Sequence, residues 1–86
     1  MKHAGAQMLA LLEPLLEGIR RTGGAALVER KPGSFYRRSA AFVHFHEDPA
    51  GLFADLKQGD GTWLRFEIRS PSQQAALLSA VALRLS

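Results

Sequence analysis

Cysteine is absent from the 86-residue chain, which excludes disulfides and thiolate metal sites. Long apolar runs are also lacking. The most apolar stretch, residues 8–19, is interrupted by Glu13, Pro14 and Glu17 and is too short for a membrane span or a clean signal peptide. Glycine-rich phosphate loops and nucleophile elbows are missing as well. We therefore expect a cytoplasmic protein with no membrane association and no cofactor.

The composition that is present favours a small folded domain. A hydrophobic share of 47% with 22% charged residues argues against disorder. At this length we expect one domain over residues 1–86, with a core near the lower limit for independent stability. Such a chain needs tight packing or oligomerisation. Residues 1–43 carry a net charge of +4 and residues 44–86 a net charge of −1.

The two ends of the chain have helical patterns. Apolar residues recur at three-and-four spacing over residues 8–19, and Pro14 should kink or restart that helix. Near the other end, Ser70 and Gln73 form a capping box with Pro71 at the first helical position, which predicts a helix to about residue 85.

Strand patterns fill the middle of the chain. Residues 26–31 and 35–38 flank a type II turn signature at Pro32-Gly33. We expect a bend or bulge near Ser39, and then a meander of residues 41–46, 51–57 and 62–68. Pairing His46 with Gly51 in the first hairpin, and Leu56 with Leu64 in the second, gives one consistent apolar face. The prediction is an α+β fold: a four-to-five-stranded antiparallel meander sheet with the N- and C-terminal helices packed on one face.

The opposite face of this sheet carries side chains that burial alone does not explain. Aromatic rings there would leave an apolar patch of the kind that soluble monomers rarely leave bare. Asp55 is expected to pair with Arg65, and Lys57 to lie against Trp63. Our first hypothesis is a non-enzymatic interaction module that self-associates or binds a protein partner through this face; a small-molecule ligand is a further possibility. The expected face consists of Phe42, His44, His46, Phe53, Asp55, Trp63, Arg65 and Glu67.

A second hypothesis is a metal-dependent or acid–base enzyme. His44 and His46 lie two apart on one strand and point the same way, a workable spacing for two imidazoles on one metal ion. Glu47 or Asp48 is the candidate third ligand. Two histidines alone do not make a site, so no metal is expected on this pattern. An acid–base pair of His44 with Glu67 is the other version.

A third hypothesis is nucleic-acid binding through the basic first half. This hypothesis requires its candidate residues to gather near the turn at Pro32-Gly33. No standard binding motif accompanies them, so we expect no nucleic-acid partner. They are Arg20, Arg21, Arg30, Lys31, Arg37 and Arg38.

One stretch resembles known sequences. Residues 42–56 read FVHFHEDPAGLFADL, and Trp63-Leu64-Arg65-Phe66 follows. This block resembles small bacterial proteins, and it is distantly similar to a domain of unknown function labelled "luciferase family". The resemblance covers about the last half of the chain. It implies a fold and a bacterial context, but it assigns no catalytic residues and does not imply light emission.

Overall fold

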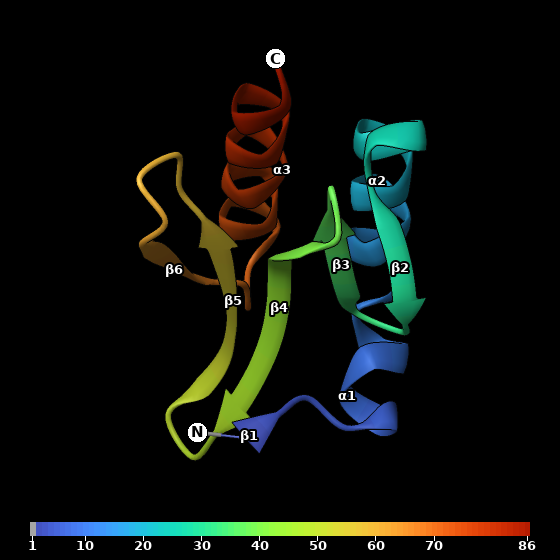
Figure 1. Cartoon of the computed structure of the whole chain (residues 1–86). Helices are drawn as coiled ribbons and strands as arrows, with labels where there is room; N and C mark the ends of the chain where they lie inside the picture. Colours follow the sequence, from blue (N-terminus) through green and yellow to red (C-terminus); the bar gives the residue numbers. More distant parts are fainter. Residues whose placement is uncertain (1) are drawn as a thin grey trace.

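The computed structural model describes residues 2–86 as a sheet with helices before and after it (Figure 1). A short 3-10 helix, Gly24–Ala26, follows the second helix. The α+β class predicted from the sequence is confirmed. In chain order the other elements are β1 (Lys2–His3), α1 (Ala6–Leu11), α2 (Glu13–Gly23), β2 (Val28–Lys31), β3 (Ser34–Arg37), β4 (Ala40–Asp48), β5 (Gly51–Lys57), β6 (Trp63–Glu67) and α3 (Pro71–Leu85).

The first helical segment breaks where the sequence predicts. Helix α1 ends at Leu11 and α2 begins at Glu13, with Pro14 in the first turn of α2. Proline is tolerated there because the amide it lacks would have no partner within the helix. The break lets α2 turn its apolar stripe to the core, where Leu15, Leu16 and Ile19 are buried.

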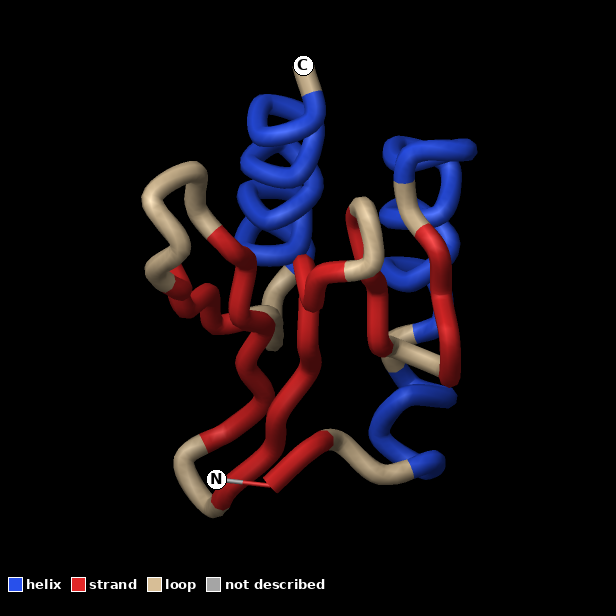
Figure 2. The backbone as a smooth tube through the Cα atoms, in the orientation of Figure 1, coloured by secondary structure: helices blue, strands red, loops and turns tan. Residues whose placement is uncertain are grey.

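The sheet has the strand order β2-β3-β4-β5-β6, and β1 adds to β4. Strand β3 pairs with the first part of β4, and β1 pairs with its last part through His3 opposite His46. Figure 2 shows β1 beside the part of β4 that extends past the end of β3. The two strands therefore share one edge of β4, and β1 is the one that the sequence analysis missed.

Helices α2 and α3 cover one face of this sheet (Figures 1 and 2). The predicted capping box of α3 is present: Ser70 accepts a hydrogen bond from the Gln73 amide, and Gln73 reaches back to Ser70. None of the helices within residues 2–86 is long and apolar enough to cross a membrane. The core between helices and sheet consists of Leu12, Leu15, Leu16, Ile19, Phe35, Phe42, Val43, Phe45, Ala54, Leu56, Ile68, Leu77 and Val81.

The β5–β6 register agrees with the sequence, but the β4–β5 register does not. Leu56 pairs with Leu64 as predicted. The predicted pairing of His46 with Gly51 is wrong, because Asp48 is the residue opposite Gly51. The turn is only Pro49-Ala50, and Asp48 Oδ1 accepts a hydrogen bond of 2.8 Å from the Ala50 amide. Aspartate, proline and a final glycine in these places are typical of a tight type I turn. The shift is two residues, so the side chains of β4 keep their faces.

The expected bend near Ser39 is instead a full hairpin between β3 and β4. Arg37 pairs with Ala40, and both intervening residues, Arg38 and Ser39, have positive φ angles of 52° and 68°. Positive φ at both central positions is the type I′ geometry that suits a two-residue hairpin. Neither residue is a glycine, so the usual sequence signal for this turn is absent.

The prediction that Phe42 lies on the open face of the sheet is wrong. The pairing of β3 with β4 moves from Phe35–Val43 to Tyr36–Ala41, so Phe42 is the extra residue of a bulge. A bulge interrupts the alternation of side chains along a strand. As a result both Phe42 and Val43 are buried, and only 2% of the Phe42 surface is exposed. Phe42 therefore belongs to the core and not to the face that carries the histidines.

Candidate metal centre

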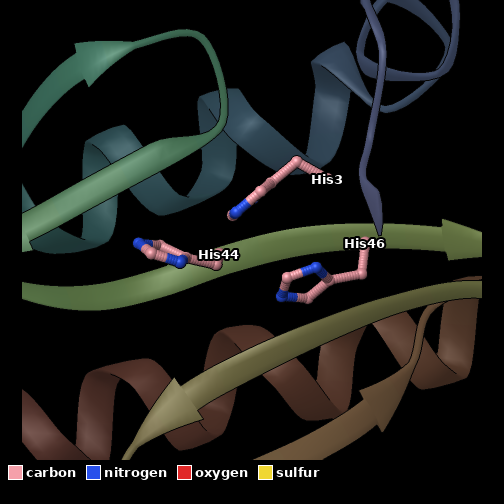
Figure 3. Close-up of side chains that lie close together, drawn as sticks. All are labelled: His3, His44 and His46. Carbon is pink, nitrogen blue, oxygen red and sulfur yellow. The ribbon is translucent and has the colours of Figure 1, made fainter. Parts of the chain in front are cut away.

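The three histidines of the chain meet on the sheet face opposite the helices. His44 and His46 lie on β4, and the ring of His3 reaches over them from β1 (Figure 3). One nitrogen from each ring lies within 4.8 Å of the others. Sequence reasoning found His44 and His46 but missed His3, because a two-residue strand has no hydrophobic period. The signal that was available is the histidine count, which is only three.

Backbone pairing fixes the place of His3. His3 is opposite His46, and the next amide, that of Ala4, donates a 3.0 Å hydrogen bond to the Phe45 carbonyl. Gly5, the residue after Ala4, is bound by Glu47: its amide donates a 2.9 Å hydrogen bond to Glu47 Oε1. Glu47 and Asp48, the predicted candidates for a third ligand, are not part of this cluster. Each carboxylate binds a nearby backbone amide, and the third nitrogen comes from His3.

Two of the imidazole nitrogens are buried without a partner. Nε2 of His44 and Nδ1 of His46 have no hydrogen-bond partner among residues 2–86. Buried polar side-chain atoms usually have one, so such exceptions call for a specific explanation. Both atoms belong to histidines of the cluster, and a bound ion would satisfy them.

Burial also keeps these two rings neutral. Desolvation lowers the pKa of His44, and the neighbouring His3 and His46 lower it further. Desolvation is likewise the largest cause of the lowered pKa of His46, opposed by the carboxylate of Asp55. A neutral imidazole is the form that coordinates a metal. The environment therefore favours the binding form near neutral pH.

Asp55 links the histidines to a guanidinium group. Its Oδ2 lies 3.3 Å from Nε2 of His46, and its two oxygens accept hydrogen bonds of 2.8 Å each from Arg65. The predicted Asp55–Arg65 pair is thus confirmed. The hydrogen bond from Arg65 is the main reason why the pKa of Asp55 is lowered. An ionised Asp55 favours a proton on Nε2 of His46, which leaves the lone pair on Nδ1.

The cluster opens into a cleft of about 390 Å³. The Trp63 ring lies 5.5 Å from the His44 ring, centroid to centroid, and the Lys57 ammonium group lies 4.6 Å from the Trp63 centroid. The predicted Lys57–Trp63 contact is therefore confirmed. The cleft is lined by His3, His44, His46, Asp55, Trp63 and Arg65.

Two residues of the predicted face lie beside the cleft and do not line it. Phe53 is partly buried beneath the Arg65 guanidinium, 5.5 Å from its ring centroid. Glu67 is exposed and pairs with Arg69 at 3.2 Å. The predicted pairing of His44 with Glu67 was wrong, because the two-residue shift of the first hairpin places Asp55 opposite His44.

Three of the six basic residues behind the nucleic-acid hypothesis contact separate partners within the fold. Arg20 forms ion pairs with Glu13, Glu17 and Glu29. The Arg30 guanidinium lies over the Tyr36 ring, and Arg37 donates to the carbonyl of Arg84 on α3. Several of the charges that suggested a nucleic-acid surface are thus committed to contacts within the fold.

Comparison with known proteins adds no further assignment: no family model, no curated protein and no solved structure matches this chain. The similarity of residues 42–56 to the domain labelled "luciferase family" stays a prediction from the sequence. The cluster of His3, His44 and His46 is accordingly interpreted from its own geometry.

Proposed function

We propose that this protein binds a divalent transition-metal ion through His3, His44 and His46. The observation that carries the proposal is the convergence of three ring nitrogens, in a cluster where Nε2 of His44 and Nδ1 of His46 are buried without partners. This adds a third ligand to the two that the sequence suggested. The proposal takes precedence over the interaction module because Phe42, one of the three aromatic residues behind that hypothesis, belongs to the core.

The spacing of the nitrogens suits an ion after a small contraction. Zinc–nitrogen bonds of about 2.0–2.1 Å place two tetrahedral ligands about 3.4 Å apart. The separations between the three nitrogens, which are at most 4.8 Å, have to shrink by up to about 1.4 Å. Small rotations of two side chains supply this, and His3 is an exposed residue with room to move.

The donor set indicates the class of ion. Three imidazoles suit zinc, nickel, copper and iron better than the hard ions magnesium and calcium. Three protein ligands with a remaining open position are typical of catalytic zinc sites, whereas structural sites are closed by four. Asp55 would orient His46 by accepting a hydrogen bond from its Nε2–H group, as carboxylates do beside many metal-bound histidines.

Calorimetry on the full chain without a histidine tag tests the proposal. We expect one zinc or cobalt ion per chain. His3→Gln, His44→Gln and His46→Gln should each weaken binding by more than about tenfold, since even changes outside the ligand set cost 10–100-fold. Glu67→Gln is the matched control, because Glu67 is exposed and pairs with Arg69 outside the cluster. Metal binding that survives all three histidine substitutions would falsify the proposal.

Self-association through the edge strand β6, beside the histidine cluster, is the second candidate. On the edge strand β6, Trp63 is 42% exposed and Leu64 is 48% exposed. Edge strands with apolar side chains are natural places for pairing between copies. Sedimentation of the chain with and without zinc tests this idea: a dimer that Trp63→Ser with Leu64→Ser converts to a monomer supports it, and a monomer at every concentration contradicts it.

A further inference from the structure

Building on the proposed metal site, we infer that the open coordination position of the ion takes a small organic oxyanion, such as a carboxylate, whose apolar part lies against Trp63. The inference names a ligand class for the cleft, which the metal proposal does not. It rests on the charge of the ligand set, the charges at the cleft and the exposed indole of its wall.

The ligand set leaves the charge of the metal uncompensated. Three neutral imidazoles contribute no negative charge, so a divalent ion would keep its full charge at the centre of the cleft. Asp55 is the carboxylate among the lining residues, but its two oxygens are both held by Arg65 at 2.8 Å. That pair is close to neutral as a unit. A site of this charge favours an anion in the remaining position.

The rim of the cleft also carries positive charge, as the metal ion would. The Lys57 ammonium group lies 4.6 Å from the ring centroid of Trp63, which itself lines the cleft. Since Arg65 is paired with Asp55, Lys57 is the positive charge that this rim adds. A fixed positive charge beside a concave surface raises the local concentration of small anions.

The cleft accepts an organic molecule and not only an inorganic ion. Its volume of about 390 Å³ is within the range of small-molecule sites. Trp63, which lines the cleft, is 42% exposed. The charged end of a ligand can bind at the metal while its apolar part packs against the large indole ring. A short aliphatic acid fits this combination.

Cobalt(II) in place of zinc gives a direct readout, because its visible spectrum changes with its coordination. We would titrate acetate, propionate, butyrate, methyl phosphate and acetamide into the cobalt-loaded full chain at constant ionic strength. Acetate should change the spectrum and acetamide, its neutral counterpart, should not. Affinity should rise from acetate to butyrate by about two- to fourfold for each added CH₂, since each buried CH₂ is favourable. Methyl phosphate tests whether another oxyanion fits equally well.

Two variants separate charge from apolar contact. Lys57→Gln should weaken acetate binding by about two- to fivefold, the range for one exposed charge, and should leave the affinity for cobalt unchanged. Trp63→Ser should retain acetate binding but lose the gain from acetate to butyrate. Neither residue is among the three metal ligands.

The outcomes distinguish this inference from the metal proposal. Failure of cobalt to bind overturns both. Cobalt binding with a spectrum unaffected by saturating acetate and methyl phosphate overturns the anion inference alone and leaves the metal proposal intact. Acetamide acting like acetate overturns the role of charge, and equal affinities for acetate and butyrate overturn the apolar wall.

Discussion

At the scale of single residues, Asp55 is the link between the histidine cluster and Arg65. It contacts His46 at 3.3 Å, and Arg65 holds it through two hydrogen bonds. This arrangement fixes the carboxylate before any ion arrives. It also selects the ring nitrogen of His46 that carries the proton.

We therefore predict that Asp55→Asn weakens zinc binding by about 10–100-fold, the usual loss when a partner of a metal-bound histidine is removed. The measurement is calorimetry on the metal-free chain. Asparagine keeps the size of aspartate but loses the charge that stabilises the Nε2 proton. Thermal unfolding without metal serves as the check on folding. An unchanged zinc affinity in a folded Asp55→Asn chain would show that Asp55 has no positioning role.

Residue-level sequence reasoning reached part of this site. The pairing of Asp55 with Arg65 follows from the β5–β6 register, which two glycines at the turn make easy to find. His3 could not be placed, because its strand has two residues and its partner lies 43 positions away. A contact of that kind depends on the tertiary fold and leaves no local pattern.

At the scale of elements, the β2–β3 turn lies against the first helix. Gly33 has φ +80°, and a Cβ there would come within 2.7 Å of Leu9 Cδ2. Gly61, in the β5–β6 loop, has a similar φ of +89° but nothing within 4 Å of such a Cβ. Alanine would adopt an unfavourable backbone conformation at both positions. Only at Gly33 would its Cβ also come too close to a neighbouring side chain.

We predict that Gly61→Ala lowers the free energy of unfolding by about 1–2 kcal/mol, the cost of an L-residue in the left-handed region. Gly33→Ala should lower it by about 1 kcal/mol more, because Leu9 must also shift. Urea unfolding of both variants measures the difference. Equal losses would indicate that Leu9 moves aside freely.

An ion pair joins α2 to the same turn. Arg20 Nε lies 2.6 Å from Glu29 Oε1, and Glu29 Oε2 accepts a 3.0 Å hydrogen bond from the Gly33 amide. The hydrogen bond from Arg20 is the main reason that the pKa of Glu29 is below its ordinary value of 4.5. A carboxylate with a lowered folded pKa stabilises the fold above its unfolded pKa, and this contribution is lost as the pH falls through the folded pKa.

We predict that Glu29→Gln costs about 1 kcal/mol near neutral pH, a modest value because the pair is partly exposed to solvent. The difference between wild type and variant should shrink as the pH falls below about 4.5. Urea unfolding over the acid range measures it. Glu17→Gln is the control, since Glu17 is an exposed partner of the same Arg20. A difference that is constant down to the lowest pH would contradict the assignment.

The elements also show where sequence patterns stop being sufficient. Period-two alternation assigned the faces of β4 correctly at His44 and His46, which lie on the same side of the sheet as His3. It failed at Phe42, because the bulge opposite β3 adds one residue and changes the alternation locally. Both hairpins of β4 have two-residue turns, and neither has the Asn-Gly or Asp-Gly signal that usually marks one.

At the scale of the whole molecule, the metal site would join the start of the chain to the centre of the sheet. His3 belongs to β1, which within residues 2–86 pairs with β4 through two residue pairs. His44 and His46 lie on β4, which pairs with β5 along one edge and with β3 and β1 along the other. An ion held by all three would therefore add a link between a two-residue strand and the central strand of the sheet.

The consequence is a stability that depends on metal. An ion that binds only the folded state adds about 2.7 kcal/mol at a free concentration of 100 Kd. For a domain of this size, 1 kcal/mol shifts the Tm by about 4–8 °C, so we predict an increase of about 10–20 °C with zinc. Calorimetric scans with zinc and with a chelator measure it.

His3→Gln isolates the contribution of β1 to this effect. At the same zinc concentration its weaker affinity should remove most of the increase in Tm, while its Tm in chelator stays close to that of wild type, because His3 is exposed and lies on a two-residue strand. Amide exchange gives a second readout: zinc should slow exchange at Ala4, whose amide donates to Phe45, in wild type but not in His3→Gln. A full increase in Tm in His3→Gln would mean that the ion does not use β1, and a site of two histidines would then have to account for binding.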